Sequence, residues 1–236
     1  MNTATDTLRT VLPRPVRRFL RSCHRDWVFR RAMAAFRRDP LAATEPGSPL
    51  LADLVYGWGN DGWSALQEYL AACIRHALAA KGPILECGSG LTTLLVGAAA
   101  EKAGVDLWSM EHLPDWGDRV GHALQRHGLG SVRLHVASLR DYAGYAWYDP
   151  PLKAMPNNFS LVICDGPPGS TWGGRYGLLP IMGSRLAPGC IILLDDAARP
   201  DEQAIAQRWQ AEAGARYETL GSQKPYIRMQ LLKDAA

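Results

Sequence analysis

Carboxylate side chains end several short apolar segments of this 236-residue chain. Asp165 directly follows the apolar run 161–164, and Asp195 and Asp196 follow the run 190–194. If these runs are neighbouring parallel strands, three carboxylates meet at one sheet edge, where their repulsion is costly unless a cation or a hydrogen-bond donor offsets it. A hard divalent cation such as Mg²⁺ prefers oxygen ligands, so the pattern favours a metal site. The alternative is that one aspartate holds a ligand or backbone N–H groups and another caps the following helix.

A glycine-rich turn follows the apolar run 83–87. Gly88 and Gly90 let the backbone turn tightly and approach a ligand closely, and the helix that follows offers free N–H groups suited to an anion. The dinucleotide-binding fingerprint has a third glycine where this chain has Thr93, and the phosphate-cradling GxxxxGK[ST] loop is absent. Pyrophosphate binding at this turn is therefore disfavoured.

Two glutamates accompany the turn. Glu86 lies within the run 83–87, and Glu111 ends the apolar run 105–110, 25 residues further on. An acid at that position can accept hydrogen bonds from both hydroxyls of a ribose. The alternative for Glu111 is a solvated loop acid, but the apolar strand that it ends favours ligand binding.

The candidate site residues can act together only if the fold brings the ends of their strands close to one another. Beyond Gly82 the sequence predicts five strands at 83–87, 105–110, 132–136, 161–164 and 190–194, and four helices at 92–103, 114–128, 174–186 and 201–213. Two final strands, 215–220 and 226–232, have a short connection and are expected to pair antiparallel. The alternation predicts an α/β fold with a parallel sheet covered by helices on both faces. Ligands in such sheets bind beyond the carboxyl ends of the strands.

The N-terminal part is organised differently. Its periodicity predicts a helix over 14–38, then a proline- and glycine-marked break, a glycine- and tryptophan-rich loop over 56–63 and a second helix over 63–80. Within the loop, Asn60 and Trp63 are candidates for the rim of the ligand site. The equally weighted alternative is a helix start and a core anchor.

Charge is unevenly distributed along the chain. Residues 1–40 contain ten arginines and three acids, a net charge of +7, whereas the rest carries 16 basic and 20 acidic side chains, a net charge of −4. A uniformly basic nucleic-acid-binding protein is thereby excluded, although a basic arm is not. The basic helix has three open interpretations beside that of a solvated charged face. We favour a lid or homodimerisation element. In the other two interpretations, the helix binds an anionic substrate or carrier, or it binds an anionic membrane surface.

The five cysteines and the hydropathy bear on the cellular setting. No C-x-x-C pair is present, and three of the cysteines lie in apolar runs, so a disulfide framework or a cysteine-based zinc site is not expected. No apolar run approaches the roughly 20 residues of a membrane span, and the first 30 residues show no signal-peptide pattern. We expect a cytoplasmic protein.

In order along the chain, these strand-end features resemble the class I S-adenosylmethionine-dependent methyltransferases. Residues 84–93 look like the first motif of that family, E/D-x-G-x-G, and residues 161–169 look like its fourth motif. The resemblance covers about 83–232. It implies a Rossmann-like seven-stranded sheet with the order 3-2-1-4-5-7-6 and an antiparallel last strand. The methyltransferase domain would then be 63–236, preceded by a basic helical extension and loop, 1–62.

The resemblance also implies roles for individual residues. Gly88 and Gly90 would pass beneath the methionine part of S-adenosylmethionine, Glu86 would orient its ammonium group, and Ser138 and Leu139 would flank the adenine. The complete cofactor site implied in this way consists of Glu86, Gly88, Ser89, Gly90, Thr93, Glu111, His112, Ser138, Leu139 and Asp165.

Within the family, the spacing is most similar to that of the cation-dependent catechol-type O-methyltransferases. In those enzymes an Asp and an acid–amide pair bind Mg²⁺; here Asp165, Asp195 and Asp196 take these positions, with Asp196 in place of the amide. The resemblance implies methyl transfer to a small molecule, on a hydroxyl oxygen, with Mg²⁺ or another divalent cation as a further expectation. Without metal, Asp165 or Asp195 would be the base or anchor. No lysine closely follows Asp165, and Arg175 and Tyr176 come ten and eleven residues later.

Two alternative functions stay open. One is a nucleic-acid or protein methyltransferase that uses the arginine-rich arm, and the other is a cofactor-binding scaffold without transfer activity. Residues 149–152, Asp-Pro-Pro-Leu, resemble the signature of amino-methylating nucleic-acid enzymes, but they precede a strand and lack the aromatic residue, so we interpret them as a turn. The acceptor pocket is expected from 1–62, 141–158 and 167–175. Aromatic residues that could line it are Tyr142, Tyr145, Trp147, Tyr148 and Trp172.

Overall fold

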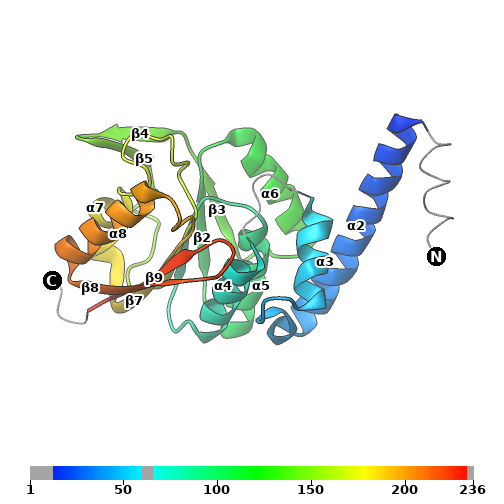
Figure 1. The fold of residues 1–236 in the computed structure, drawn as a ribbon, viewed down its shortest axis with the longest axis horizontal. Helices are drawn as coiled ribbons and strands as arrows, with labels where there is room; N and C mark the ends of the chain where they lie inside the picture. The colour runs from blue at the N-terminus through cyan, green and yellow to red at the C-terminus, as the bar shows by residue number, and fades with distance from the viewer. Residues whose placement is uncertain (1–12, 60–65, 233–236) are drawn as a thin grey trace.

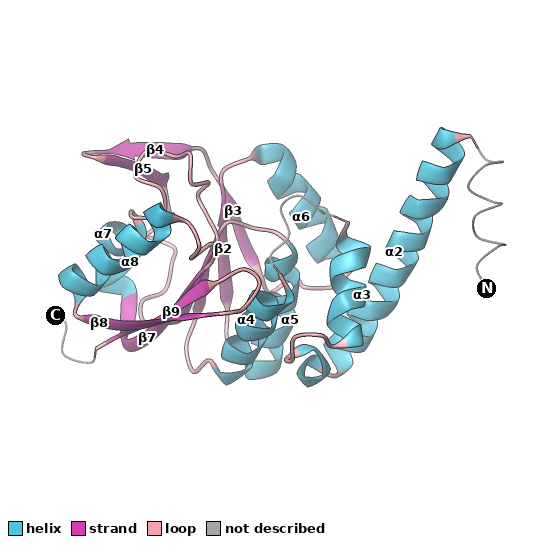
Figure 2. Ribbon diagram, viewed as in Figure 1, coloured by secondary structure: helices cyan, strands magenta, loops and turns pink. Residues whose placement is uncertain are grey.

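A computed structural model describes residues 13–59 and 66–232 of the chain. Its centre is a seven-stranded sheet with the order β3-β2-β1-β6-β7-β9-β8 (Figures 1 and 2). The strands are β1 Ile84–Cys87, β2 Leu107–Glu111, β3 Arg133–Val136, β6 Phe159–Cys164, β7 Leu186–Leu194, β8 Ala215–Leu220 and β9 Tyr226–Leu231. Counted within this sheet alone, the order is the predicted 3-2-1-4-5-7-6. The last strand, β9, runs antiparallel to both of its neighbours, as predicted.

Helices cover both faces of the sheet, because successive strand residues point to opposite sides. Ile84 and Ile163 pack with α4 Gln67–Ala79, α5 Leu91–Ala103 and α6 Pro114–Arg126. Leu85 and Val162 point the other way and pack with α7 Leu178–Met182 and α8 Pro200–Ala213. The two apolar clusters therefore lie on opposite faces of one sheet. The ends of its strands remain available to form a site.

The N-terminal helix begins and ends where the periodicity predicts. α2 spans Arg14–Arg38 and is followed by a short 3-10 helix, η1, Pro40–Ala43. Five residues of its C-terminal half are buried against the body: Val28, Phe29, Ala32, Met33 and Phe36. The N-terminal half leans away from the body (Figure 1), and Phe19 there is 67% exposed. None of the helices in the described parts of the chain has the length and apolar character needed to cross a membrane.

The prediction of a loop over 56–63 was wrong in its first part. A further helix, α3, spans Pro49–Trp58, so Tyr56, Gly57 and Trp58 form its last turn. Ser48 caps the helix by accepting a hydrogen bond from the Leu51 amide, and Gly59 ends it in the left-handed conformation. Asn60 and Trp63 lie outside the described residues. The helix predicted over 63–80 is present as α4.

Two other predictions of local structure need correction. Residues read as a connection form a separate two-stranded hairpin, β4 Leu139–Tyr142 with β5 Tyr145–Tyr148. The helix predicted over 174–186 is much shorter: α7 has five residues and is followed by the 3-10 turn η2, Gly183–Arg185. Gly173 and Gly174 have positive φ angles, which are incompatible with an α-helix, so the helix cannot begin at residue 174 as predicted.

Candidate functional site

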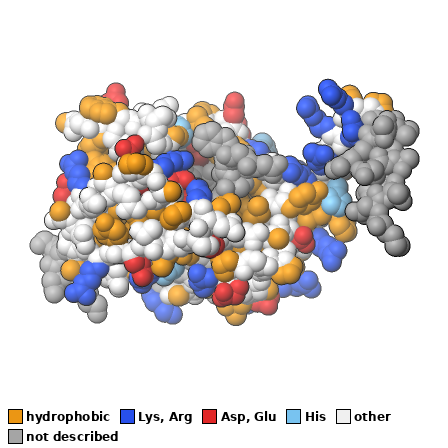
Figure 3. All heavy atoms as spheres, viewed as in Figure 1, with side chains coloured by type: hydrophobic (Ala, Val, Ile, Leu, Met, Phe, Trp, Pro, Cys, Tyr) orange, Lys and Arg blue, Asp and Glu red, His pale blue; other side chains and the backbone are white. Residues whose placement is uncertain are grey.

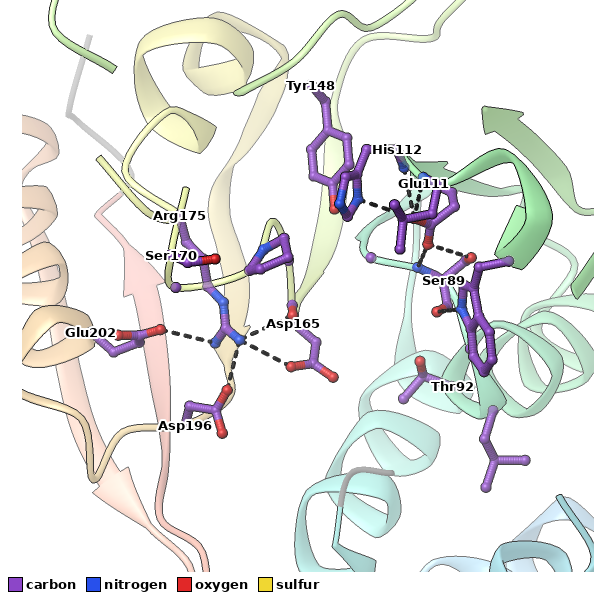
Figure 4. A pocket seen from close by; sticks show the side chains of 18 of the residues that line it. Ser89, Thr92, Glu111, His112, Tyr148, Asp165, Ser170, Arg175, Asp196 and Glu202 are labelled. Atoms are coloured by element: carbon purple, nitrogen blue, oxygen red, sulfur yellow. Dashed lines mark hydrogen bonds and ion pairs between the residues drawn. The ribbon is translucent and has the colours of Figure 1, made fainter. Parts of the chain in front are cut away.

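A cavity of about 870 Å³ opens at the carboxyl ends of β1, β2, β6 and β7. Seven of the predicted site residues line it: Gly88, Ser89, Gly90, Glu111, His112, Asp165 and Asp196. Figure 4 shows them in two groups on opposite sides of the cavity, one around Glu111 and Ser89 and the other around Asp165 and Asp196. The volume is within the roughly 300–1,000 Å³ typical of cofactor and small-molecule sites.

The turn after β1 has the two glycines for different reasons. Gly88 has φ +92°, and a Cβ there would lie 3.1 Å from the Gly166 amide nitrogen, so both backbone conformation and close packing require glycine. Gly90 has φ 173°, an extended conformation open to any residue, and a Cβ there would meet no protein atom within 4 Å. The space above Gly90 belongs to the cavity, where a side chain would take the room of a ligand.

Glu86 lies beneath this turn, is fully buried and does not itself line the cavity. Its Oε2 accepts hydrogen bonds from Thr93 Oγ1 at 2.7 Å and from Ser109 Oγ at 2.6 Å. Its Oε1 is buried without a hydrogen-bond partner among the described residues. Burial raises the pKa of Glu86 to about 7, although the hydroxyl donors oppose the shift. A buried carboxylate oxygen without a donor is suited to a cationic group of a ligand.

Thr93 does not line the cavity. Its hydroxyl accepts a hydrogen bond from the Gly90 amide at 2.8 Å and donates to Glu86. The threonine therefore fixes the glycine turn to the carboxylate below it. This contact explains the residue that stands where the dinucleotide-binding fingerprint has glycine.

Glu111 at the end of β2 accepts four hydrogen bonds from the protein. The donors are the Ser89 amide and hydroxyl at 3.1 and 2.8 Å, the His112 amide at 2.7 Å and the Leu113 amide at 2.9 Å. A carboxylate has about four acceptor positions, so all are used. A ligand hydroxyl bound to Glu111 must take the place of the Ser89 hydroxyl, the one donor here that can rotate away.

Arg175 lies in the middle of the acidic group on the other side of the cavity (Figure 4). Its side chain is only 2% exposed, and Nη2 donates to Asp165 Oδ1 at 3.1 Å and to Asp196 Oδ2 at 2.8 Å. The guanidinium also donates to the carbonyl oxygens of Asp165 and Asp195, at 3.0 and 2.7 Å. Glu202 Oε1 lies 3.7 Å from Nη1. One arginine thus holds the ends of β6 and β7 together.

Lys224, in the connection between β8 and β9, supplies a second cation. Its Nζ lies 2.6 Å from Asp195 Oδ2 and 2.8 Å from Asp196 Oδ1. Asp196 has φ +62°, a conformation that a non-glycine residue adopts only when its surroundings hold it. Lys224 and Arg175 provide those contacts on the two oxygens of the Asp196 carboxylate.

The aspartates of this cluster differ in acidity. Burial and the neighbouring charge of Asp195 raise the pKa of Asp165 to about 7, against the opposing effects of Arg175 and Lys224. Burial would also raise the pKa of Asp196, but the hydrogen bond from Lys224 and the charge of Arg175 lower it below its usual value. Near neutral pH, Asp196 is therefore ionised, whereas Asp165 can gain or lose a proton.

The predicted metal site can be compared with this arrangement. Asp165, Asp195 and Asp196 each offer an oxygen, and these oxygens lie within 4.8 Å of one another. However, protein cations already bond all three side chains, Arg175 those of Asp165 and Asp196, and Lys224 those of Asp195 and Asp196. Because the protein itself offsets the carboxylate charge, the residues present do not fit a resident divalent cation.

Other predicted residues stand apart from the cavity. Ser138 is exposed, Leu139 begins β4, and neither lines the cavity. Asp195 is fully buried behind Lys224. Trp58 and Ser170 line the cavity from segments expected to form the acceptor pocket. Conversely, the lining includes residues that the sequence did not indicate as site residues: Leu113, Trp116, Arg199, Glu202 and Lys224. They come from elements far apart in the sequence, and no local pattern marks them.

The fold is similar to that of several solved methyltransferases. The precorrin-6y C5,15-methyltransferase of Geobacter metallireducens GS-15 superposes with a TM-score of 0.56 at 16% identity, over 72% of this chain and 91% of that one. The SAH-bound methyltransferase PaMTH1 of Podospora anserina gives 0.55 at 17%, over 73% and 82%. The C-terminal domain of the Rhodobacter capsulatus precorrin-6Y C5,15-methyltransferase gives 0.51 at 18%, over 80% and 98%.

Sequence comparison alone gives no such match. No family model and no curated protein matches the chain. At these identities, the structural likeness shows a shared fold, and the argument for function therefore depends on the site.

Proposed function

Because the chain has the class I methyltransferase fold, we propose that it is an S-adenosylmethionine-dependent methyltransferase acting on a hydroxyl of a small molecule. The observation that carries the proposal is the cavity at the strand ends. It has an open glycine turn on one side, above the unpartnered oxygen of Glu86, and the titratable Asp165 on the other. A cofactor and an acceptor can therefore meet in one space.

Residues on the β1–β2 side suit the cofactor. Glu86, which lies just outside the cavity lining, would orient its α-ammonium group directly or through water, and the space above Gly90 would take its methionine part. Glu111 would bind the ribose hydroxyls when the Ser89 hydroxyl turns aside. When bound, S-adenosylmethionine supplies an electrophilic methyl group on a sulfonium sulfur.

Asp165 is proposed as the general base. It lines the cavity with a 27% exposed side chain, and Arg175 holds its Oδ1. Among the described residues, no hydrogen bond reaches its Oδ2, so this oxygen can accept the proton that an acceptor hydroxyl loses as it is methylated. A base with a pKa near 7 suits such a transfer at neutral pH. Holding the reactants in line can supply about 7–11 kcal/mol of the barrier.

The proposed reaction uses no divalent cation at the aspartate cluster. Arg175 and Lys224 already offset the charge of Asp165, Asp195 and Asp196. Asp195 would then stabilise the site by holding Lys224, because its carboxylate lies fully buried, away from the cavity.

Isothermal titration calorimetry with S-adenosylmethionine and S-adenosylhomocysteine tests the cofactor. We expect both to bind wild-type protein and the Asp165→Asn variant, with and without EDTA. Failure of wild-type protein to bind either compound would reject the proposal. For the acceptor, labelled methyl transfer into a deproteinised cell extract should fall about 10²–10⁴-fold in Asp165→Asn, the usual contribution of a general base. Undiminished transfer by this variant would reject the role of Asp165.

A further inference from the structure

A second cavity, of about 630 Å³, lies between α2, α3 and α6. α2 contributes Arg18, Arg21, Ser22, Arg25, Asp26 and Phe29, and α6 contributes Arg119, His122, Ala123 and Arg126, followed directly by His127. The end of α3 closes it with Gly57, Trp58 and Gly59. The proposed reaction makes no use of this cavity.

The lining of this second cavity is strongly basic. It contains five arginines and a single acid, Asp26, which bonds Arg126 at 2.9 Å and the neighbouring Arg30 at 3.2 Å. The spacing of Arg18, Arg21 and Arg25 places them on one face of α2, and that of Arg119 and Arg126 places them on one face of α6. Two rows of cations thus face the same space, and Figure 3 shows basic side chains gathered at the N-terminal end of α2. Their mutual repulsion is relieved when an anion binds between them.

Arg119 is held in place before any ligand binds. Its guanidinium lies 4.9 Å from the Trp58 ring centre and 4.8 Å from that of Trp116, and Nη2 donates to the Trp58 carbonyl at 3.0 Å. A guanidinium held against two indole rings loses little freedom on binding an anion. Because these contacts fix Arg119 in advance, the cavity differs from a group of mobile surface arginines that happen to lie close together.

Trp58 also connects the two cavities, because it lines both. Its ring meets Trp116 edge to face, with centres 6.1 Å apart, and Trp116 Nε1 donates to the Ser89 carbonyl in the glycine turn at 2.8 Å. A ligand held among the arginines on one side of Trp58 therefore lies next to the glycine turn on the other, and its hydroxyl must extend past Trp58 and across the first cavity to reach Asp165.

We propose that the second cavity binds a phosphate group of the methyl acceptor, so that the substrate is a phosphorylated small molecule. This inference rests on the proposed function for the role of the ligand, but not for its binding. Phosphate is favoured over a carboxylate because its several oxygens can accept from arginine forks on two helices at once.

Calorimetric titration with inorganic pyrophosphate tests the site without knowledge of the acceptor. Wild-type protein is expected to bind pyrophosphate at low salt, with affinity that falls as salt screens the arginines. The double variant Arg18→Ala/Arg21→Ala, which changes two exposed residues, should bind at least tenfold more weakly. Arg119→Ala should do the same, and Arg38→Ala, an exposed position of α2 outside the cavity, should bind like wild type. Equal affinity of wild type and the double variant, or no binding by wild type, overturns the proposal.

A transfer assay then tests the acceptor. Labelled transfer into the cell extract should disappear after the extract is treated with phosphatase, and it should fall at least tenfold in Arg18→Ala/Arg21→Ala. Transfer that survives both changes overturns the assignment of a phosphorylated acceptor. Vesicles containing a phosphatidylinositol monophosphate, which carries both a phosphate and free hydroxyls, are added as a separate arm. Label that enters the lipid fraction indicates a lipid acceptor, and label that stays in the aqueous fraction indicates a soluble one.

Binding of S-adenosylmethionine, measured on each variant, separates the two proposals. Loss of pyrophosphate binding with intact cofactor binding in the double variant supports the second cavity as a distinct site. Absence of cofactor binding in wild type would reject the proposed function while leaving the pyrophosphate result readable.

Discussion

Glu86 and Arg175 show how single residues set the properties of the site. Both are buried charged groups, but their surroundings differ. Glu86 keeps one oxygen without a donor, whereas Arg175 bonds two carboxylates and two carbonyl oxygens. We propose a ligand-binding role for Glu86, whereas Arg175 holds the ends of β6 and β7 together.

Cofactor affinity is expected to depend on pH through Glu86. Its pKa of about 7 means that it is ionised, and able to pair with an ammonium group, only as the pH rises through neutrality. Affinity for S-adenosylmethionine should therefore increase about fivefold from pH 6 to pH 7, below the range in which an α-amino group loses its own proton. Glu86→Gln should bind weakly with a flatter profile, and Glu218→Gln, at an exposed position, should behave like wild type. Calorimetry at both pH values measures this; a wild-type profile in Glu86→Gln would contradict it.

Removing the buried arginine should cost more stability at high pH. Arg175→Met leaves carboxylates uncompensated, and breaking a buried pair costs about 3–5 kcal/mol. The pKa of Asp165 is about 7, well above that of an unfolded aspartate, so the folded state takes up a proton on acidification. The loss of stability caused by Arg175→Met should therefore be smaller at pH 6 than at pH 8.

Urea unfolding at the two pH values measures the effect, with Arg185→Met as the matched control. Arg185 donates to the carbonyl oxygens of Met155 and Pro156 and to the Asn157 amide oxygen, and within the described parts of the chain it pairs with no carboxylate. The loss of stability in Arg185→Met should be smaller than in Arg175→Met and independent of pH. An equal loss at both pH values in Arg175→Met would count against the role of Asp165.

At the scale of elements, periodicity predicted α2 and the main-sheet strands but missed α3 and the hairpin of β4 and β5. The reason is visible at Gly57. Glycines near a tryptophan indicate a loop by composition, yet here a helix needs glycine because it packs closely on another: a Cβ at Gly57 would lie 2.7 Å from the Phe29 Cβ. Such tertiary contacts have no signature within a short stretch of sequence.

Gly57→Ala should therefore force α2 and α3 apart, at about 1–3 kcal/mol, the usual cost of overpacking. The control is Gly183→Ala, since Gly183 has helical φ and ψ angles and open space around its Cβ position. That change should be neutral or stabilise the protein by up to about 1 kcal/mol. Urea unfolding compares them, and equal effects of the two substitutions would refute the close-packing argument.

At the scale of the whole molecule, the N-terminal helix has two different halves. Its C-terminal half belongs to the same apolar cluster as the sheet residue Ile84, with Phe36 fully buried. Its N-terminal half exposes Phe19 and directs arginines into the second cavity. The basic arm inferred from charge is thus joined to the methyltransferase fold through its core rather than tethered to it.

We expect the described parts of the chain to unfold as one unit. Phe36→Ala should lower the free energy of unfolding by about 3–5 kcal/mol and shift a single transition seen by both circular dichroism and tryptophan fluorescence. Phe19→Ala, the same change on the exposed half of the same helix, should have little effect. Separate transitions in Phe36→Ala would show instead that the predicted boundary at residue 62 divides two folding units.

The sequence by itself determined the succession of strands and helices, the glycine turn and the carboxylates at the strand ends, because periodicity and backbone conformation are local properties of the chain. The order of the strands within the sheet was implied by the resemblance to the methyltransferases. Only the tertiary structure decided how the charges pair. Lys224 meets Asp195 and Asp196, and Arg175 lies between Asp165 and Asp196, through contacts that depend on how the strand ends and loops come together. The acids that suggested Mg²⁺ are in this way neutralised by the protein's own cations. The sequence shows the negative charge that must be offset, but it does not show which cation lies close enough to offset it.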